Sequence, residues 1–187
     1  MQEAKRYGWL LMLLAAMQIG ITSTTAKSAF AQSAAVKAAL PEASLLGKGN
    51  YTWFGLSLYE ARLWADKKSF SASSWSGSGL ALELVYARRL YGERIAVASI
   101  DEIKKLGIGT PAQHDAWLSA MKKIFPDVDE GTQLIGLYAP GQPTRFFRDG
   151  AAIGEISDPE FGVAFCGIWL HPKTSAPKLR AALLSGK

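Results

Sequence analysis

The alternation of apolar and polar positions predicts a set of short β-strands. The run from Leu80 to Tyr86 shows it most clearly, because every second residue is large and apolar, as in a strand with one buried face. Five stretches have strand character: 56–64, 80–87, 134–138, 145–148 and 151–156. Asp149 and Gly150 separate the last two, and this dipeptide favours a type I′ hairpin turn.

From residue 92 the apolar period lengthens to three or four residues, which is typical of helices. The first helix is predicted over 92–106, with Gly107 as its C-cap. Thr110 and Asp158 each precede a proline, the usual start of a helix, and so predict helices from Pro111 and Pro159. A last helix is expected over about 176–184.

The order of these elements indicates the fold class. Strands come as hairpins and helices as a consecutive pair, whereas a doubly wound fold would alternate strand and helix. We therefore expect an α+β fold, a large antiparallel sheet with a layer of helices on one face. Residues 69–79, with six Ser and two Gly, are typical of a mobile surface loop. The Ala-rich segment 32–44 is expected to be a flexible lead-in to a domain over 45–187.

The first 31 residues have the features of a signal peptide. Lys5 and Arg6 precede an apolar stretch over 9–21, and Ala29-Phe30-Ala31 forms an A-x-A cleavage site. As a helix this stretch would measure about 20 Å, short of the roughly 30 Å hydrocarbon core. We therefore expect export to the periplasm or secretion, with no permanent membrane span after cleavage; the alternative is an uncleaved membrane helix.

Composition narrows the function classes. With 187 residues, 49% of them hydrophobic, the chain has material for one packed core. Cleavage would remove three basic residues and one acidic residue, lowering the net charge from +5 to +3. That charge is too small to indicate a nucleic-acid partner, although Arg88, Arg89 and Arg94 cluster. These arginines are expected to form a solvated face or to contact an anion.

Few residues suggest metal or nucleophilic chemistry. The lone Cys166 lies in an apolar helix and is interpreted as core, and His114 and His171 are not expected to be catalytic. The acidic run 127–132 lacks the spacing of a calcium loop and is interpreted as a helix-to-strand connection. The sequence has no P-loop or dinucleotide-binding motif. We therefore expect no metal site, no cofactor and no catalytic residue.

Longer strings resemble the bacterial chalcone isomerase-like family, and the resemblance covers about residues 45–184. Its weight lies in the order of many short matches: Gly47-Lys48-Gly49, Trp53-Phe54-Gly55, Leu58-Tyr59-Glu60-Ala61-Arg62-Leu63-Trp64, Leu82-Glu83-Leu84-Val85-Tyr86, Phe125-Pro126-Asp127-Val128, Gly154-Glu155-Ile156, Asp158-Pro159-Glu160-Phe161 and Gly167-Ile168-Trp169-Leu170. The resemblance implies an open-faced β-sandwich with a ligand cleft between the sheet and the helices.

The catalytic residues of the family's plant enzymes have no match here. Those enzymes cyclise chalcones by stabilising a developing negative charge, which requires a cation and hydroxyl donors. Their Arg follows the first Gly-x-Gly, where this chain has Asn50-Tyr51-Thr52. Their Thr falls near Phe54, and their Tyr and Asn fall near Ile95 and Glu102. The resemblance therefore implies a protein that is not an active isomerase.

Other members of the superfamily bind fatty acids in the same cleft, where an Arg and a Tyr hold the carboxylate. That Arg is also absent, so a different polar end is expected from Tyr59, Tyr86, Arg88 and Arg89. Three functions remain open. They are a non-catalytic carrier of an apolar or carboxylated, fatty-acid-like small molecule, an isomerase or intramolecular lyase of chalcone type, and a structural or partner-binding envelope protein whose protein partner is unknown.

The cleavage site gives the first testable prediction. The mature protein should begin at Gln32, because the A-x-A site ends at Ala31. Cell fractionation followed by N-terminal sequencing of the isolated chain checks this expectation. Protein retained in the membrane with residues before Gln32 still attached would contradict it.

Overall fold

The computed structural model describes residues 32–185, so the expected signal peptide over 1–31 lies outside the described residues. Six antiparallel strands form one sheet, and their order in the sheet is their order in the chain. The strands are β1 (Ser44–Trp53), β2 (Leu56–Ala65), β3 (Leu80–Tyr86), β4 (Gln133–Tyr138), β5 (Thr144–Arg148) and β6 (Ala151–Ile156). The five expected strands are present. Asp149 and Gly150 join β5 to β6 with positive φ at both residues, as a type I′ turn requires.

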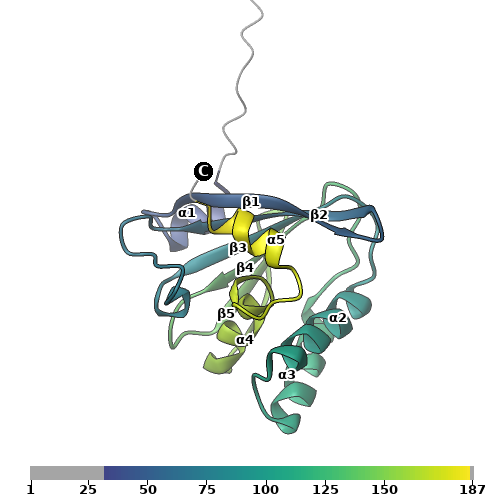
Figure 1. Cartoon of the computed structure of the whole chain (residues 1–187). Helices are drawn as coiled ribbons and strands as arrows, with labels where there is room; N and C mark the ends of the chain where they lie inside the picture. Colours follow the sequence, from purple (N-terminus) through teal and green to yellow (C-terminus); the bar gives the residue numbers. More distant parts are fainter. Residues whose placement is uncertain (1–31, 186–187) are drawn as a thin grey trace, which may run out of the picture. The chain divides into compact units, whose positions relative to one another are not determined.

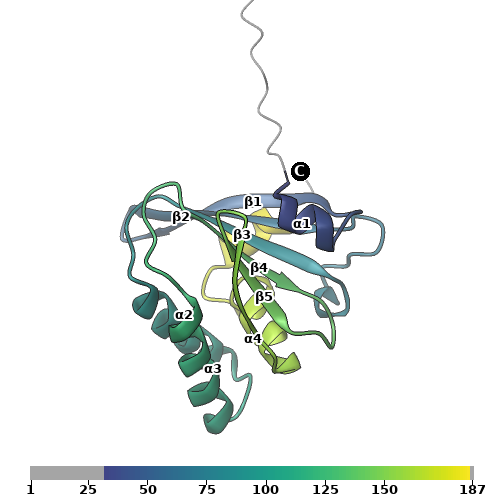
Figure 2. The same ribbon diagram turned by 180° about the vertical axis from the view of Figure 1, so that it is seen from behind.

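Helices cover the sheet unequally. They are α1 (Ala34–Ala39), α2 (Gly92–Leu106), α3 (Pro111–Ile124), α4 (Pro159–Leu170) and α5 (Pro177–Leu183), with a short 3₁₀ helix at Trp75–Gly77. Figure 1 shows α5 in front of the sheet and Figure 2 shows α1 in front, so they lie on opposite faces. The larger helices lie on the α5 face, which confirms the α+β class and the expected helical layer.

Helix boundaries follow the expected capping residues. Thr110 caps α3 through a capping box with Gln113. The Asp158 side chain accepts the N–H of Glu160 at the start of α4, and Gly107 ends α2 in the left-handed conformation. These three signals could be read directly from the sequence because each depends only on local backbone chemistry.

α4 is buried along most of its length and forms the centre of the helical layer. Phe161 and Phe165 stack with ring centroids 5.5 Å apart, and Phe146 of β5 meets both rings edge-on. Cys166 on the same helix is fully buried, as expected of a core residue. Burial raises the pKa of its thiol, which keeps that thiol protonated and unreactive.

The segment before β1 differs from the expected flexible lead-in. It contains α1, whose first turn is capped because the Ser33 hydroxyl accepts the N–H of Val36 at 3.2 Å. Val36 is fully buried against Trp64 and Ile135, which belong to a small apolar cluster on the outer face of the sheet. Burial of Val36, with Ala39 and Leu40 packed against the same cluster, holds the segment in place, and neither composition nor periodicity could show these contacts.

The serine-rich segment 69–79 is a loop, as expected, but its middle is anchored. Trp75 is buried and meets the ring of Tyr138 edge-on, with centroids 6.5 Å apart. The Tyr138 hydroxyl donates a hydrogen bond to the Ser76 carbonyl at 2.6 Å. These two contacts attach the loop to the core.

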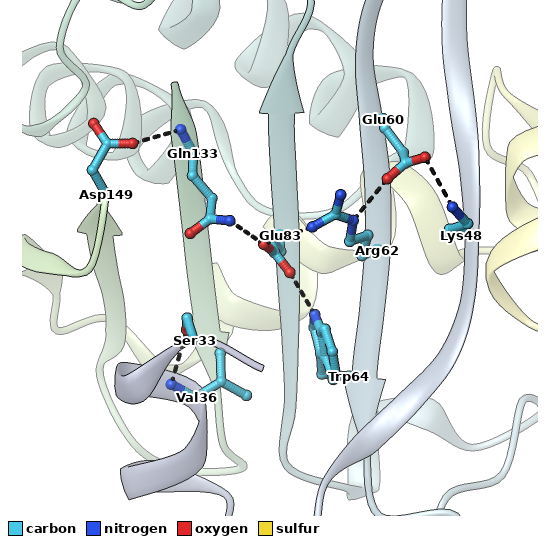
Figure 3. Close-up of polar contacts among 9 residues, drawn as sticks. All are labelled: Ser33, Val36, Lys48, Glu60, Arg62, Trp64, Glu83, Gln133 and Asp149. Carbon is cyan, nitrogen blue, oxygen red and sulfur yellow. Dashed lines mark hydrogen bonds and ion pairs between the residues drawn. The ribbon is translucent and has the colours of Figure 1, made fainter. Parts of the chain in front are cut away.

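The outer face of the sheet carries a buried polar network, drawn in Figure 3. Glu83 of β3 is fully buried, and its carboxylate accepts a hydrogen bond from the Trp64 indole at 2.7 Å. It also accepts a hydrogen bond from the Gln133 side chain and pairs with Arg62 at 3.2 Å. A buried carboxylate is tolerated only with such partners, so Glu83 joins β2, β3 and β4 across their width.

The network continues to the edge of the sheet through Glu60. Its carboxylate lies 2.7 Å from Arg62 and 3.3 Å from Lys48 of β1. Burial acts to raise the pKa of Glu60, but the hydrogen bonds and charges of Arg62 and Lys48 outweigh it and hold the pKa below its usual value. These pairs therefore stabilise the fold at neutral pH, and their contribution is lost as the pH falls through that lowered pKa.

β1 is not among the strands that the pattern predicts, because Gly47, Lys48 and Gly49 interrupt its apolar residues. The structure gives the glycines a packing role. A Cβ at Gly47 would overlap the Ala182 and Leu183 carbonyls, so α5 can lie against β1 only because that Cβ is missing.

This contact predicts that Gly47→Ala lowers the free energy of unfolding by about 1–3 kcal/mol, because backbone atoms of α5 would have to move. Gly77→Ala is the matched control, since its added Cβ would meet nothing within 4 Å. The control should stay within about 0.5 kcal/mol of the wild type. Urea unfolding measures both, and equal stability of the two variants would contradict the proposed close contact.

Candidate functional site

A cavity of about 540 Å³ lies between the sheet and the helical layer. Its floor is the inner face of β1, β2, β3 and β4, with Phe146 of β5 beside it, one wall is α2, and another is α4. Apolar side chains supply most of the lining, including Leu82, Leu84, Ile95, Phe165 and Ile168. The space exists because α2 packs on α3 and α4 rather than directly on the first three strands.

The start of α2 is fixed by the loop that follows α3. The Asp127 carboxylate accepts the N–H of Gly92 at 2.9 Å, and Leu90 pairs with Val128 as an isolated antiparallel bridge. A Cβ at Gly92 would overlap the Phe125 carbonyl. The acidic run 127–132 is therefore the expected helix-to-strand connection, and it sets the distance between α2 and the sheet.

Three tyrosines form the polar part of the cavity floor. Tyr51 and Tyr59 stack with ring centroids 5.2 Å apart, and Tyr86 meets Tyr59 edge-on at 5.8 Å. The Trp169 indole N–H donates to the Tyr59 hydroxyl at 3.0 Å, so that oxygen is an acceptor and its own proton remains to be donated.

Burial keeps two of these phenols neutral. It raises the pKa of Tyr59 far above its ordinary value, although the hydrogen bond from Trp169 acts in the opposite direction. Burial also raises the pKa of Tyr86. Both hydroxyls therefore serve as hydrogen-bond donors or acceptors and not as bases.

Arginines line the cavity where the chain passes from β3 to α2. Arg88, Arg89 and Arg94 all contribute to the lining and are exposed. The guanidinium carbons of Arg89 and Arg94 each lie 5.6 Å from the centroid of the Tyr91 ring. Asp129 is 3.9 Å from Arg89, and within residues 32–185 no acidic side chain pairs with Arg88 or Arg94. The cavity mouth is therefore positively charged.

The four residues expected to bind a ligand lie at one site. Tyr59, Tyr86, Arg88 and Arg89 all line the cavity, with the tyrosines inside and the arginines at the mouth. Sequence reasoning placed Arg94 in a basic cluster but not at the site. The sequence signal that could have placed Arg94 at the site is its position six residues after Arg88, just inside the predicted helix.

Positions suggested by the family resemblance also reach the cavity. Tyr51, Ile95 and Glu102 line it, whereas Asn50 and Phe54 do not. Glu102 is already engaged, because its carboxylate lies 2.7 Å from Lys105 and accepts a hydrogen bond from the Ser175 hydroxyl.

The two histidines lie elsewhere. A ring nitrogen of His114 is 2.8 Å from the Ile108 carbonyl, and His171 follows the end of α4. Within residues 32–185, His, Cys, Asp and Glu side chains form no group of three or more that could hold a metal ion. No helix in that range is long and apolar enough to cross a membrane.

Comparison with known proteins identifies the family. The sequence profile described as chalcone isomerase-like matches residues 23–185, most of the chain. The chain belongs to the chalcone isomerase-like family. An uncharacterized protein of Haemophilus influenzae is 27% identical over 139 residues, covering 74% of this chain and 66% of that protein. The aligned part is thus just under two thirds of that relative's length.

A solved structure shows the same fold. The crystal structure of the fatty-acid binding protein AtFAP1 of Arabidopsis thaliana superposes with a TM-score of 0.61 at 14% identity. The match covers 76% of this chain and 87% of that chain. At this identity the likeness shows a shared fold and no more.

The tyrosine contacts predict different costs for two similar substitutions. Tyr59→Phe should destabilise the protein by about 1–3 kcal/mol, because the buried Trp169 N–H would lose its acceptor. Tyr86→Phe should change stability by about 0.5 kcal/mol or less, since no residue within 32–185 hydrogen-bonds its hydroxyl. Thermal melting of both variants checks this order, and a larger loss for Tyr86→Phe would contradict it.

Proposed function

We propose that this chain is an exported, non-catalytic binding protein for an apolar small molecule with a carboxylate, such as a fatty acid. The cavity of about 540 Å³ carries the proposal, because small-molecule pockets measure about 300–1,000 Å³ and are mostly apolar with a few polar groups. Export rests on the signal peptide expected over residues 1–31.

The distribution of polar groups suggests how the ligand is oriented. An alkyl chain placed over Leu82 and Leu84 would contact mostly apolar side chains, which favours its transfer out of water. A carboxylate left at the mouth would meet Arg88 and Arg94, whose guanidinium groups match a carboxylate in charge and geometry. Tyr59 would then offer its hydroxyl to any polar group deeper in the cavity.

The same groups are poorly arranged for chalcone-type chemistry. That reaction needs a cation held where negative charge develops, inside a site shielded from water. The arginines here are exposed at the mouth, so the neutral tyrosine hydroxyls within could donate hydrogen bonds but have no shielded cation beside them. Glu102 is paired with Lys105, so the lining offers no free carboxylate base. Membership of the family and the fold shared with a fatty-acid binding protein agree with a binding role.

A ligand comparison tests the proposal. A fluorescent fatty acid should bind the purified chain. An unlabelled fatty acid should displace it with an affinity about tenfold higher than that of the alcohol of equal chain length, because only the acid forms charge-assisted hydrogen bonds. Replacing Arg88 and Arg94 together with Gln should remove this preference and leave the affinity for the alcohol unchanged. Titration of each ligand against wild type and variant measures both effects.

Other results would support the other functions. Clear acceleration of chalcone cyclisation over the uncatalysed rate, followed by absorbance, would overturn the non-catalytic reading in favour of an isomerase. Absence of fatty-acid binding, together with no small molecule co-purified in native mass spectrometry, would favour a structural or partner-binding role.

A further inference from the structure

The turn between β1 and β2 exposes a group of large apolar side chains beside the cavity mouth. Trp53, Phe54 and Leu56, here called the apolar tip, are 58%, 86% and 48% exposed. Trp53 and Leu56 also line the cavity. Scattered exposed apolar residues are ordinary in soluble proteins, but a contiguous group at a ligand entrance indicates an interaction surface.

The backbone of this turn makes the choice of Phe54 unusual. Phe54 has φ +47° and Gly55 has φ +78°, whereas the matching positions of the β5–β6 turn, Asp149 and Gly150, have +48° and +86°. Asp, Asn and Gly suit this left-handed conformation, and a bulky aromatic residue is disfavoured there. Phe54 therefore adds backbone strain, and its ring stays 86% exposed although it meets the Trp53 ring edge-on with centroids 4.7 Å apart. Most of its apolar surface is left uncovered by the described residues.

Positive charge lies directly beside the apolar tip. The Ala87 N–H donates to the Leu58 carbonyl at 2.9 Å, which attaches the segment after β3 to the base of the β1–β2 turn. Arg88, Arg89 and Arg94 follow on that segment and at the start of α2. Figure 1 shows the β1–β2 turn and the start of α2 at the same end of the sheet.

We propose that this end of the molecule docks on an anionic lipid bilayer. Apolar and aromatic side chains bordered by arginines match the two layers of such a surface, the acyl boundary and the anionic headgroups. The apolar tip would enter the interfacial region while the three arginines meet lipid phosphates. Because Trp53, Leu56 and the three arginines also line the cavity, docking would turn the cavity mouth toward the bilayer. This part of the proposal rests on the proposed binding function.

A label at the apolar tip tests docking in the full chain. Phe54→Cys can be modified selectively with an environment-sensitive fluorophore, because the lone natural cysteine, Cys166, is fully buried. Ser74→Cys is the matched control, since it lies in the exposed loop at the other end of β2. On vesicles of phosphatidylglycerol and phosphatidylcholine, the label at position 54 should brighten and shift to the blue, and the label at position 74 should not.

Variants that lack the arginine charges measure how much these charges contribute to docking. Changing Arg88, Arg89 and Arg94 to Gln should raise the lipid concentration needed for half of the position-54 signal about 100-fold, since each arginine near an anionic surface contributes about fivefold. Vesicles of phosphatidylcholine alone should give a similarly weak signal with the unmodified arginines. An equal signal on both kinds of vesicle would overturn the proposed role of the arginines.

Phe54→Asn separates docking from ligand binding. Asn suits positive φ and Phe54 does not line the cavity, so this variant should fold normally and bind fatty acid in solution like the wild type. Fatty-acid transfer from anionic vesicles should be about tenfold slower, because one apolar anchor is lost. Phe54→Leu should restore most of that rate.

Three results would overturn the docking proposal. The position-54 label could remain unchanged on anionic vesicles, or both labels could respond equally, which would show attachment elsewhere in the chain. A position-54 signal that grows with protein concentration without lipid would indicate a second copy of the chain as the occupant.

A different result would separate the two proposals. If fatty acid fails to bind in solution while the position-54 label still responds to vesicles, the proposed function fails and docking stands.

Discussion

The close packing of α4 on the sheet determines where everything else can lie. Gly136 of β4 faces the Phe165 ring, and a Cβ there would lie 3.0 Å from it; a Cβ at Gly162 of α4 would overlap Tyr138. With α4 held this close, Phe161 and Phe165 pack against Phe146 of β5. α2 then rests on α4 instead of the first three strands, and the cavity is the space that remains.

The two faces of β2 have different roles. Tyr59 faces the cavity, whereas Arg62 and Trp64 face outward and hold the buried Glu83. Burial of a carboxylate stabilises little by itself, but removing a partner would be costly. The outer network therefore keeps the cavity floor in one arrangement, which allows a preformed site to bind ligand without first ordering its own residues.

Much of the fold could be predicted because its signals are local. Capping at Thr110 and Asp158, and the turn at Asp149-Gly150, depend on a few neighbouring residues. What could not be predicted depends on distant contacts. β1 lacks an apolar pattern because Gly47 makes room for α5, and α1 is held by Val36 against residues far along the chain.

The residues of the candidate site also divide into those that the sequence could place and those that depend on distant contacts. Tyr86 could be placed because strand alternation puts it on the apolar face, and Tyr59 was indicated by the family resemblance. Tyr51 could not, since its strand was not recognised. Arg94 reaches the mouth because Asp127 and the Leu90–Val128 bridge fix the start of α2, and both contacts span the whole of α2 and α3.

The strand order also bears on how the chain folds. Neighbouring strands are joined by turns or, between β2 and β3, by the serine-rich loop, whereas β3 and β4 are separated by all of α2 and α3. Closing that long connection carries the largest loop entropy in the sheet, and forming the helix pair first shortens the effective loop. The α2 wall of the cavity belongs to this connection, and the floor strand β3 leads directly into it. The binding space therefore takes shape with the most non-local pairing of the sheet, after the hairpins that border it can already have formed.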